Sequence, residues 1–325
     1  MSRRNNNEKA NEYTDDYMRI PIIKSKFNKF KDFFYNPEKK TVLGKNRKQW
    51  GITGLFYLVF FSALAALFAA CMAALMATVS TDRPRWTLDQ SLIGTNPGLG
   101  FRPISENPHE LALIFYKSTN QTQREVWINR LDDYLKNYIN KSSLSNGGVN
   151  HQICSYEFPN LKSNHVCDVN LQKDFGNCTS EKQYGFNNSS PCIFIKLNKI
   201  FDWVPDYYEP SELPDDMPAD LVKHIKSYSN KSELNTVWVS CQGEEAEDRE
   251  SLGPITYYPK IRGFPGYYYP YKNIPGYLSP LVAVKFERPE RNKIINVECR
   301  AWAKNIKFHQ RQKIGMVHFE LRIDD

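Results

Sequence analysis

The longest apolar segment of the chain runs from Gly51 to Val79, 29 positions without Asp, Glu, Lys, Arg or His. A helix rises about 1.5 Å per residue and the hydrocarbon core of a bilayer is about 30 Å thick, so this segment is long enough to cross a membrane. A cleaved signal peptide is the alternative, but its apolar core is about 7 to 15 residues long and lies close to the N-terminus. The pattern therefore predicts a tail over 1–50, a single-pass transmembrane α-helix over 51–79 and a folded domain over 80–325.

Periodic patterns predict the secondary structure of that folded domain. Within 122–141 the apolar residues recur at helical spacing with charged residues between them, which predicts an amphipathic helix. Within 316–323 apolar and polar residues alternate, as in a half-buried antiparallel strand. Similar strand signals occur at 192–200, 236–241, 281–287 and 294–303. Antiparallel strands separated by turns rich in Pro and Gly favour a mainly-β domain, built as a β-sandwich.

Charge predicts the orientation of the span. Residues 1–50 contain 13 Lys and Arg against 6 Asp and Glu, whereas residues 80–325 contain 30 of each sign. Because basic residues gather on the cytosolic side of membrane spans, this asymmetry predicts a cytoplasmic basic tail and an extracellular C-terminal domain, the type II arrangement. A basic tail is also typical of nucleic-acid binding. Beside a span we expect contact with anionic membrane lipid instead, and no nucleic acid.

Glycosylation sequons agree with that orientation. Six Asn-x-Ser/Thr triplets follow the span and none precedes it; they begin at Asn120, Asn140, Asn177, Asn187, Asn188 and Asn230. Sequons are used on accessible loops of proteins in the secretory pathway. The sequence therefore predicts a glycosylated extracellular domain. Since the triplets at Asn187 and Asn188 overlap, we expect at most one of that pair to be modified.

Six of the seven cysteines lie beyond the span, at Cys154, Cys167, Cys178, Cys192, Cys241 and Cys299. An even number in an oxidising compartment predicts three disulfides, with 15 possible connectivities. Cys241 and Cys299 each share a face with apolar residues of a predicted strand, so two facing strands clipped by this pair would follow naturally. Zinc is the competing use, but no Cys-x-x-Cys or paired-His spacing is present, and we predict no metal site. We interpret Cys71, inside the span, as a small apolar residue.

No catalytic motif accompanies this topology, although Golgi glycosyltransferases share it. Those enzymes commonly hold a metal–nucleotide with an Asp-x-Asp pair, which this sequence lacks. It also lacks a Gly-x-Ser-x-Gly elbow, a His-Glu-x-x-His motif and a phosphate-binding glycine loop. The sequence therefore predicts a protein that is not an enzyme and that needs no cofactor.

The span itself has a composition typical of helix contacts. Small residues recur in steps of four through Ser62, Ala66 and Ala70, and a small face lets two helix backbones approach closely in lipid. Bulky residues lie toward the cytosolic half and could wedge between the helices of a polytopic partner; they are Phe56, Tyr57, Phe60 and Phe61. A simpler interpretation is that Ala is merely tolerated in lipid and that Tyr57 belongs to the interfacial aromatic belt.

Residues 257–280 contain seven tyrosines, among them Tyr268, Tyr269 and Tyr271, together with several prolines. Tyrosine offers a large contact area with a hydrogen-bonding tip, and proline holds the chain extended with little entropy left to lose. Two interpretations are equally supported, a protein–protein surface and a loop packed on its own domain.

Short motifs along the chain carry a family resemblance. They are Tyr35-Asn36-Pro37 and Leu43-Gly44 before the span, Leu55-Phe56-Tyr57 at its start, Phe101-Arg102-Pro103 beyond it, then Gly176-Asn177-Cys178-Thr179, Pro191-Cys192, Tyr268-Tyr269-Pro270-Tyr271 and Glu298-Cys299. In this order, and with six extracellular cysteines, the chain resembles the β subunit of the Na,K-ATPase and of its proton/potassium relatives over nearly its whole length.

The resemblance implies a non-catalytic subunit of the plasma membrane that assembles with the catalytic α subunit of a P-type cation pump. Such subunits support the folding, export and surface delivery of the α subunit and modulate its potassium affinity. The span residues named above and Tyr268, Tyr269 and Tyr271 are then expected to contact the α subunit. Whether a small single-span regulatory subunit joins the pair is left open.

The resemblance also implies an ectodomain that is an immunoglobulin-like antiparallel β-sandwich with a helical insertion. It implies pairing of the cysteines in sequence order, Cys154 with Cys167, Cys178 with Cys192 and Cys241 with Cys299. Phe61 departs from the Tyr of many relatives, which removes a possible hydroxyl contact in the span. The alternative function, from another class, is a cell-adhesion or junction glycoprotein that acts through its ectodomain.

Overall fold

The computed structural model describes residues 30, 33–37, 40–144, 146–159, 162 and 164–325. The chain divides into two compact units, with the boundary between Val79 and Ser80.

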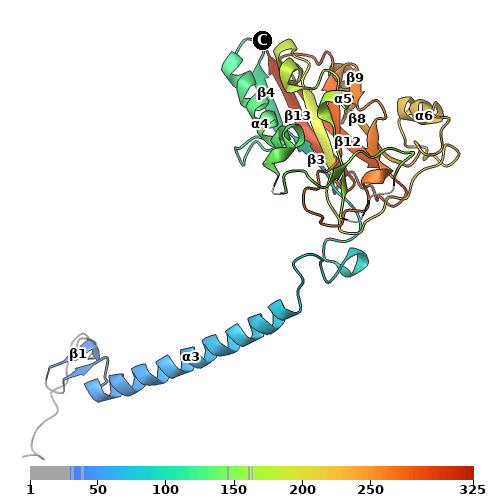
Figure 1. Ribbon diagram of the computed structural model, residues 1–325. Coiled ribbons are helices and arrows are strands. Elements are labelled where there is room, and N and C mark those ends of the chain that lie inside the picture. The colour runs from blue at the N-terminus through green and yellow to red at the C-terminus, as the bar shows by residue number, and fades with distance from the viewer. Residues whose placement is uncertain (1–29, 31–32, 38–39, 145, 160–161, 163) are drawn as a thin grey trace, which may run out of the picture. The chain divides into compact units, whose positions relative to one another are not determined.

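The first unit contains a short hairpin and one long helix (Figure 1). Strands β1 (Tyr35–Asn36) and β2 (Thr41–Val42) pair antiparallel, and α3 (Arg47–Ala77) follows them. Among the described residues, α3 is the one helix that is long and apolar enough to cross a membrane; its mean hydropathy is 2.4 over an 18-residue window, and none of its residues is buried. This helix near the N-terminus fits a single-pass membrane protein.

The start of α3 lies four residues before the predicted span, because polar residues cap it. The Asn46 side chain accepts a hydrogen bond from the backbone N–H of Arg47, and the Gln49 side chain accepts one from the N–H of Asn46. These bonds satisfy donors that a helix N-terminus leaves free. At the other end the Thr78 hydroxyl donates to the Leu75 carbonyl, so the helix stops two residues before Val79.

The second unit is mostly β and is built on two sheets (Figure 1). The five-stranded sheet has the order β10 (Gly263–Pro265), β8 (Thr236–Gly243), β12 (Ile294–Trp302), β13 (Met316–Asp324) and β4 (Leu113–Lys117). The four-stranded sheet has the order β3 (Leu99–Arg102), β7 (Cys192–Leu197), β11 (Leu281–Phe286) and β9 (Ile255–Tyr258). A separate pair, β5 (His151–Gln152) and β6 (Val166–Cys167), lies outside both sheets.

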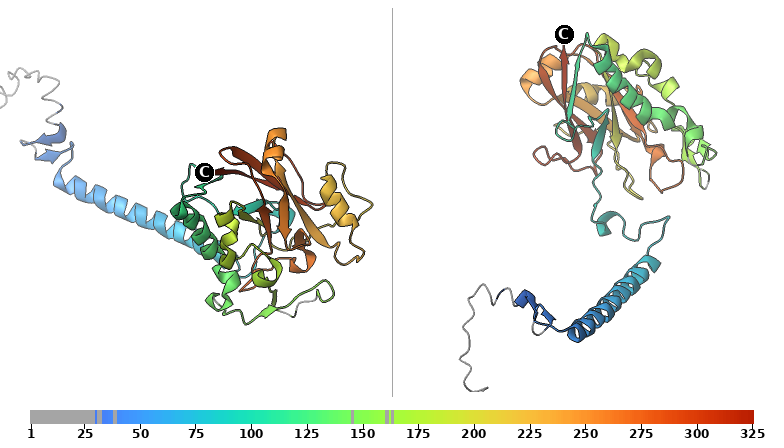
Figure 2. Two further views of the ribbon diagram at one scale, coloured as in Figure 1. Left: turned by 90° about the horizontal axis from the view of Figure 1, so that it is seen from above. Right: turned by 90° about the vertical axis from the view of Figure 1, so that its left-hand side faces the viewer.

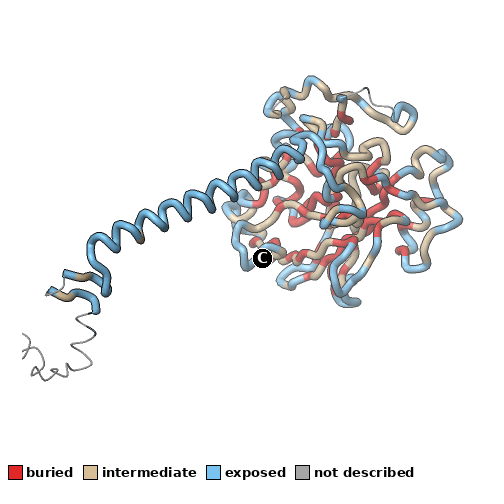
Figure 3. Tube along the Cα trace, turned by 90° about the horizontal axis from the view of Figure 1, so that it is seen from below, coloured by how far each residue is buried: buried red, intermediate tan, exposed pale blue. Residues whose placement is uncertain are grey.

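The main hydrophobic core lies between the two sheets. Phe319 of β13 is stacked on Phe101 of β3, with ring centroids 5.0 Å apart, and meets Phe286 of β11 edge-on at 6.1 Å. All three belong to one buried cluster that both sheets supply. Figure 3 shows the buried residues gathered in the interior of this unit. The five strands predicted from periodicity are confirmed within a few residues at each end.

The pairing in the two large sheets is antiparallel with one exception. β13 pairs with β4 in parallel, with Leu321 opposite Ile114, so the expectation of a purely antiparallel sandwich is wrong at this edge. Parallel strands need a long connection between them, and nearly two hundred residues separate β4 from β13. The remaining strand pairs of the two sheets are antiparallel, as predicted.

The predicted helix over 122–141 is confirmed as α4 (Gln121–Ile139), which buries Trp127, Leu131 and Leu135 among others. It ends two residues early because Asn140 leaves the helical conformation and caps it. The short helices α5 (Leu171–Asp174), α6 (Ala219–Lys226) and α7 (Ala246–Leu252) and the 3₁₀ segments η1 (Leu88–Gln90), η2 (Lys141–Ser143), η3 (Ser180–Asn188) and η4 (Gly266–Tyr268) complete the unit. Figures 1 and 2 show α4 beside β4 on one flank and α6 on the other.

Candidate subunit interface and modification sites

Three disulfides fix the second unit. The structure bonds Cys154 to Cys167, Cys178 to Cys192 and Cys241 to Cys299, the order that the resemblance implies. Cys241 and Cys299 are direct register partners on β8 and β12, so this disulfide joins neighbouring strands of one sheet rather than the two sheets. The seventh cysteine, Cys71, is unpaired and exposed on α3.

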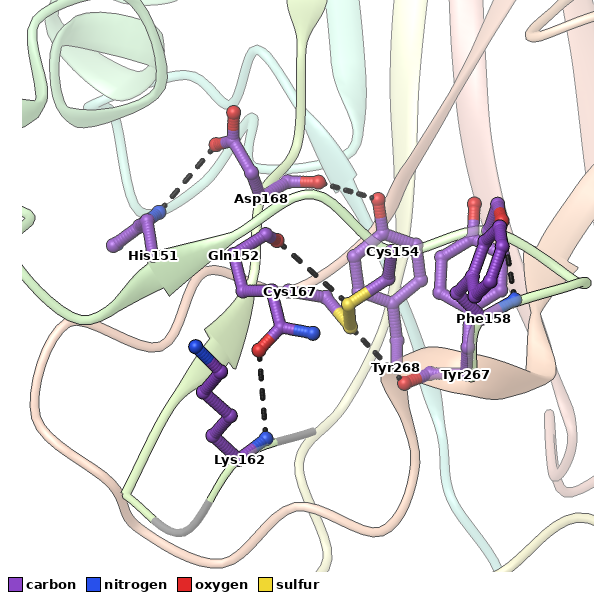
Figure 4. The surroundings of a disulfide bond; sticks show 10 residues. His151, Gln152, Cys154, Phe158, Lys162, Cys167, Asp168, Tyr267 and Tyr268 are labelled. Atoms are coloured by element: carbon purple, nitrogen blue, oxygen red, sulfur yellow. Dashed lines mark hydrogen bonds and ion pairs between the residues drawn. A yellow bond between two sulfur atoms is a disulfide. The ribbon is translucent and has the colours of Figure 1, made fainter. Parts of the chain in front are cut away.

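The Cys154–Cys167 disulfide lies against the tyrosine-rich segment (Figure 4). The Tyr268 hydroxyl donates to the backbone carbonyl of Asp168 at 2.9 Å. The Asp168 carboxylate forms an ion pair with Lys141 and lies 3.4 Å from Nδ1 of His151. Nε2 of His151 lies 2.9 Å from the carbonyl oxygen of Gly276, so this disulfide-bonded lobe contacts the tyrosine-rich segment at its middle and near its C-terminal end.

The three tyrosines predicted to contact a partner differ in their surroundings. Tyr268 is committed to its own domain through the bond to Asp168. Tyr269 packs edge-on against Trp203 at 5.6 Å, and burial raises the pKa of its hydroxyl well above the usual value. Tyr271 is less deeply buried than the other two; its ring packs against Tyr277 at 4.9 Å, and its hydroxyl donates to Asn273 at 2.8 Å. A loop packed on its own domain therefore describes Tyr268 and most of Tyr269, while Tyr271 keeps a partly open face.

A cleft of about 780 Å³ opens beside this segment. Its walls are aromatic and charged, and include Arg83, Phe201, Asp202, Tyr267, Tyr269 and Lys272. An ion pair of 3.0 Å between Arg83 and Asp202 crosses its edge, and the guanidinium of Arg83 lies 5.8 Å from the ring centroid of Phe201. Aromatic rings surrounded by polar groups are typical of protein–protein contact surfaces. Sequence patterns gave no sign of this cleft beyond the tyrosines, because its walls come from separate segments spread between Asp82 and Ile274.

The predicted contact residues of the span are all exposed on α3. Phe56 stacks on Phe60 at 6.1 Å and Tyr57 on Phe61 at 5.9 Å, which makes one aromatic side. With about 3.6 residues per turn, the row that starts at Ser62 lies roughly on the opposite side of the helix. The structure therefore does not bring the bulky set and the small set onto one face.

All six sequon asparagines are exposed. The Asn120 side-chain oxygen caps α4 by accepting from the N–H of Gln123. The oxygens of Asn140 and Asn230 each accept from the N–H and the hydroxyl of the serine two residues on. A glycan is attached to the amide nitrogen, so these bonds are compatible with modification.

The Asn188 triplet differs from the others. Its serine, Ser190, is buried, and the Ser190 hydroxyl donates to the carbonyl of Glu287 at 2.5 Å. The same hydroxyl lies 3.5 Å from the backbone carbonyl oxygen of Asn188, so in the folded domain it is held by backbone groups and not by the Asn188 side chain. Within the described ranges, no group of three or more His, Cys, Asp or Glu side chains is arranged to hold a metal ion.

Comparisons with known proteins agree with these features. Residues 21–319 match the family model described as the sodium / potassium ATPase beta chain. The chain is 47% identical over 312 residues to sodium/potassium-transporting ATPase subunit beta-2 of Drosophila melanogaster, covering 95% of this chain and 96% of that one. It is 43% identical over 297 residues to subunit beta-1 of the same species (91% and 93%), and 31% identical over 310 residues to subunit beta-2 of Homo sapiens (91% and 94%). The chain therefore belongs to the sodium/potassium ATPase β-chain family, as an accessory subunit of the pump rather than its catalytic chain.

Proposed function

We propose that this chain assembles with a catalytic α subunit at the plasma membrane, supports its folding, export and surface delivery, and modulates its potassium affinity. The observation that carries the proposal is the family match over residues 21–319, which includes both α3 and nearly all of the second unit. The N-terminus is cytoplasmic and the second unit extracellular, which the basic tail and the position of the sequons support.

Two surfaces make the contact with the α subunit. In the membrane, the row through Ser62, Ala66 and Ala70 lets a neighbouring helix approach α3 closely, and dispersion then holds the pair because lipid provides no hydrophobic drive. The aromatic side with Phe56 and Phe60 is left for a second α-subunit helix, for lipid or for a small single-span regulatory subunit. Outside, the cleft beside Tyr269 and Tyr271 takes an extracellular loop of the α subunit.

The two sheets form an immunoglobulin-like sandwich with α4 as the helical insertion. The shared core around Phe319 and the face-to-face sheets support this architecture. Glycans are carried by Asn120, Asn140, Asn177 and Asn230, and by Asn187 rather than Asn188, since the hydroxyl of Ser190 is engaged.

The deciding experiment expresses an α subunit with and without this chain and measures surface ouabain binding and potassium-dependent ATPase activity. Both increase when the chain is present. Unchanged values on omission refute the proposal.

A matched pair of helix variants tests the membrane contact. Ala66→Phe places bulk on the small row, whereas Leu64→Phe places it on the other side at nearly the same depth. Recovery of the α subunit with the epitope-tagged chain falls more for Ala66→Phe than for Leu64→Phe. Equal recovery with both variants contradicts the assignment of the small row to the α subunit.

A further inference from the structure

The hairpin β1–β2 is fixed to the first turn of α3. Nε1 of Trp50, a residue of that turn, donates a hydrogen bond of 2.8 Å to the carbonyl oxygen of Val42 in β2. Nζ of Lys45 donates to the Thr53 hydroxyl at 3.1 Å and lies 5.6 Å from the centroid of the Trp50 ring. These contacts bridge the hairpin and the helix on both sides of the Asn46 cap. The hairpin therefore lies beside the N-terminal end of α3 (Figure 1).

One face of this hairpin is apolar and exposed. Tyr35 and Val42 are cross-strand partners and share a face, while Asn36 and Thr41 share the other. Tyr35 is 58% exposed and Val42 47%, whereas Asn36 and Thr41 are half-buried. Further exposed apolar side chains lie next to the two strands in sequence, namely Phe30, Phe33, Phe34 and Leu43. So many exposed apolar side chains in one short segment are unusual on a surface that faces only water.

Basic residues are frequent in and around the hairpin. Between residues 31 and 50 the sequence has six Lys and Arg against two Asp and Glu. Lys40, Lys45, Arg47 and Lys48 are exposed. Aromatic and aliphatic side chains combined with Lys and Arg are typical of segments that lie in the headgroup layer of an anionic leaflet.

The depth of the hairpin follows from the length of the span. At about 1.5 Å per residue, the uncharged part of α3 from Gly51 to Ala77 extends about 40 Å, close to the full thickness of a bilayer with its headgroup regions. Trp50 then lies at the headgroup level, where tryptophan is enriched. The Trp50–Val42 hydrogen bond holds the hairpin at the same level.

We propose that the hairpin lies in the headgroup layer of an anionic leaflet, with Tyr35 and Val42 directed toward the acyl chains, and that it fixes the depth of α3 in the bilayer. That this leaflet is the cytosolic one rests on the proposed topology. Contact with lipid itself needs only α3 to span the membrane.

Spin labels on adjacent residues test the proposal in the full chain co-purified with its α subunit. In a Cys71→Ser background, Val42→Cys carries the label on the apolar face, and Thr41→Cys, the matched control, carries it on the opposite face. In nanodiscs that contain phosphatidylcholine and phosphatidylserine, the collision rate of each label is measured with oxygen, which partitions into lipid, and with a water-soluble nickel chelate. We expect a higher ratio of oxygen to nickel accessibility at position 42 than at position 41.

A further variant links the effect to the helix. Trp50→Phe keeps an aromatic ring but removes the donor to Val42, so the ratio at position 42 should fall toward that at position 41. If Trp50 is intact and the ratio of oxygen to nickel accessibility is the same at positions 41 and 42, the proposal is overturned. So does a label at position 42 that is shielded from both reagents only when the α subunit is present, since the hairpin then docks on protein.

The orientation of the chain in the membrane is tested separately with a membrane-impermeant thiol reagent on intact cells. Reaction at Val42→Cys shows that the N-terminus is outside, which refutes the proposed orientation whatever the accessibility ratios are. Absence of that reaction, with labelling after permeabilisation, supports the cytosolic leaflet.

Discussion

The Cys241–Cys299 disulfide joins the middle strands of the five-stranded sheet, so its removal measures how strongly that sheet depends on the bond. The perturbation is the double variant Cys241→Ala with Cys299→Ala. The two cysteines are 58 residues apart in sequence, and in the chain-entropy model a loop of that size stabilises the folded state by roughly 4 kcal/mol. Since a domain is stable by about 5 to 15 kcal/mol in total, this loss is a large fraction.

The Cys154–Cys167 disulfide provides a comparison within the same molecule. Its cysteines are 13 residues apart, which corresponds to roughly 3 kcal/mol. Cys167 lies in β6 and Cys154 follows β5, and this pair of strands is separate from the two large sheets. The lobe can therefore open locally without unfolding the core. The measured effect on global unfolding should therefore be smaller than the loop estimate. Cys71→Ala should have no effect, because Cys71 is exposed on α3.

The assay is urea unfolding of the full chain in mild detergent, followed by tryptophan fluorescence. With a denaturant slope of about 2 to 3 kcal/mol per molar urea, the Cys241/Cys299 double variant should lower the midpoint by roughly 1.3 to 2 M. Single replacement of Cys241 or Cys299 by Ser should also reduce surface yield more than replacement of Cys71 by Ser. The reasoning is refuted if the Cys154/Cys167 double variant shifts the midpoint as much as the Cys241/Cys299 variant, or if all three single Ser variants give equal yield.

Three further predictions concern other parts of the second unit. Burial lowers the pKa of His224 below its ordinary 6.5, although the hydrogen bond to the Ile261 carbonyl opposes this shift. The unfolded chain therefore binds the proton more readily than the folded one. The free energy of unfolding should fall as the pH drops below about 6.5. His224→Gln should flatten this part of the pH dependence of the urea midpoint, and an unchanged slope would contradict the assignment. Gly185→Ala should lower the free energy of unfolding by about 2 to 5 kcal/mol in the same assay. Gly185 has a φ of +75°, and an added Cβ would lie 2.1 Å from the carbonyl oxygen of Ser190. An unchanged urea midpoint would argue against that backbone conformation. Asn230→Gln should raise the electrophoretic mobility of the expressed chain by one glycan, whereas Asn188→Gln should not, and the reverse result would show that the Ser190 hydroxyl does not decide occupancy.

The sequence predicted those helices and strands in which the pattern of apolar positions repeats several times. The helix α4 has five turns with buried residues such as Trp127 and Leu131 on one stripe, and β13 has nine residues in alternation. The helices α6 and α7 have only 8 and 7 residues, and β3, β4, β9 and β10 have 3 to 5. Segments that short contain too few repeats for a period to be recognised.

The candidate site was only partly accessible to sequence reasoning. The tyrosine-rich segment stood out by composition, but composition alone could not show that Tyr268 is bonded inward while Tyr271 remains partly open. The cleft needs Arg83 and Phe201 to meet Tyr269, and no local pattern reports that tertiary contact. Likewise, β4 pairs in parallel with β13, which is distant in sequence, and no local pattern in either strand indicates its partner or the direction of pairing.

That parallel pairing sets an order of events during synthesis. β4 emerges from the ribosome nearly two hundred residues before β13, which is its only sheet partner in the described structure. At about 5 to 20 residues per second, the strand waits roughly 10 to 40 s with its backbone groups unpaired. Cys241 can already have met Cys299 during that interval, because β8 and β12 are complete before β13 appears. The disulfide-linked strands β8 and β12 can therefore pair first, and β4, the first strand of this sheet in sequence, is the last to be enclosed.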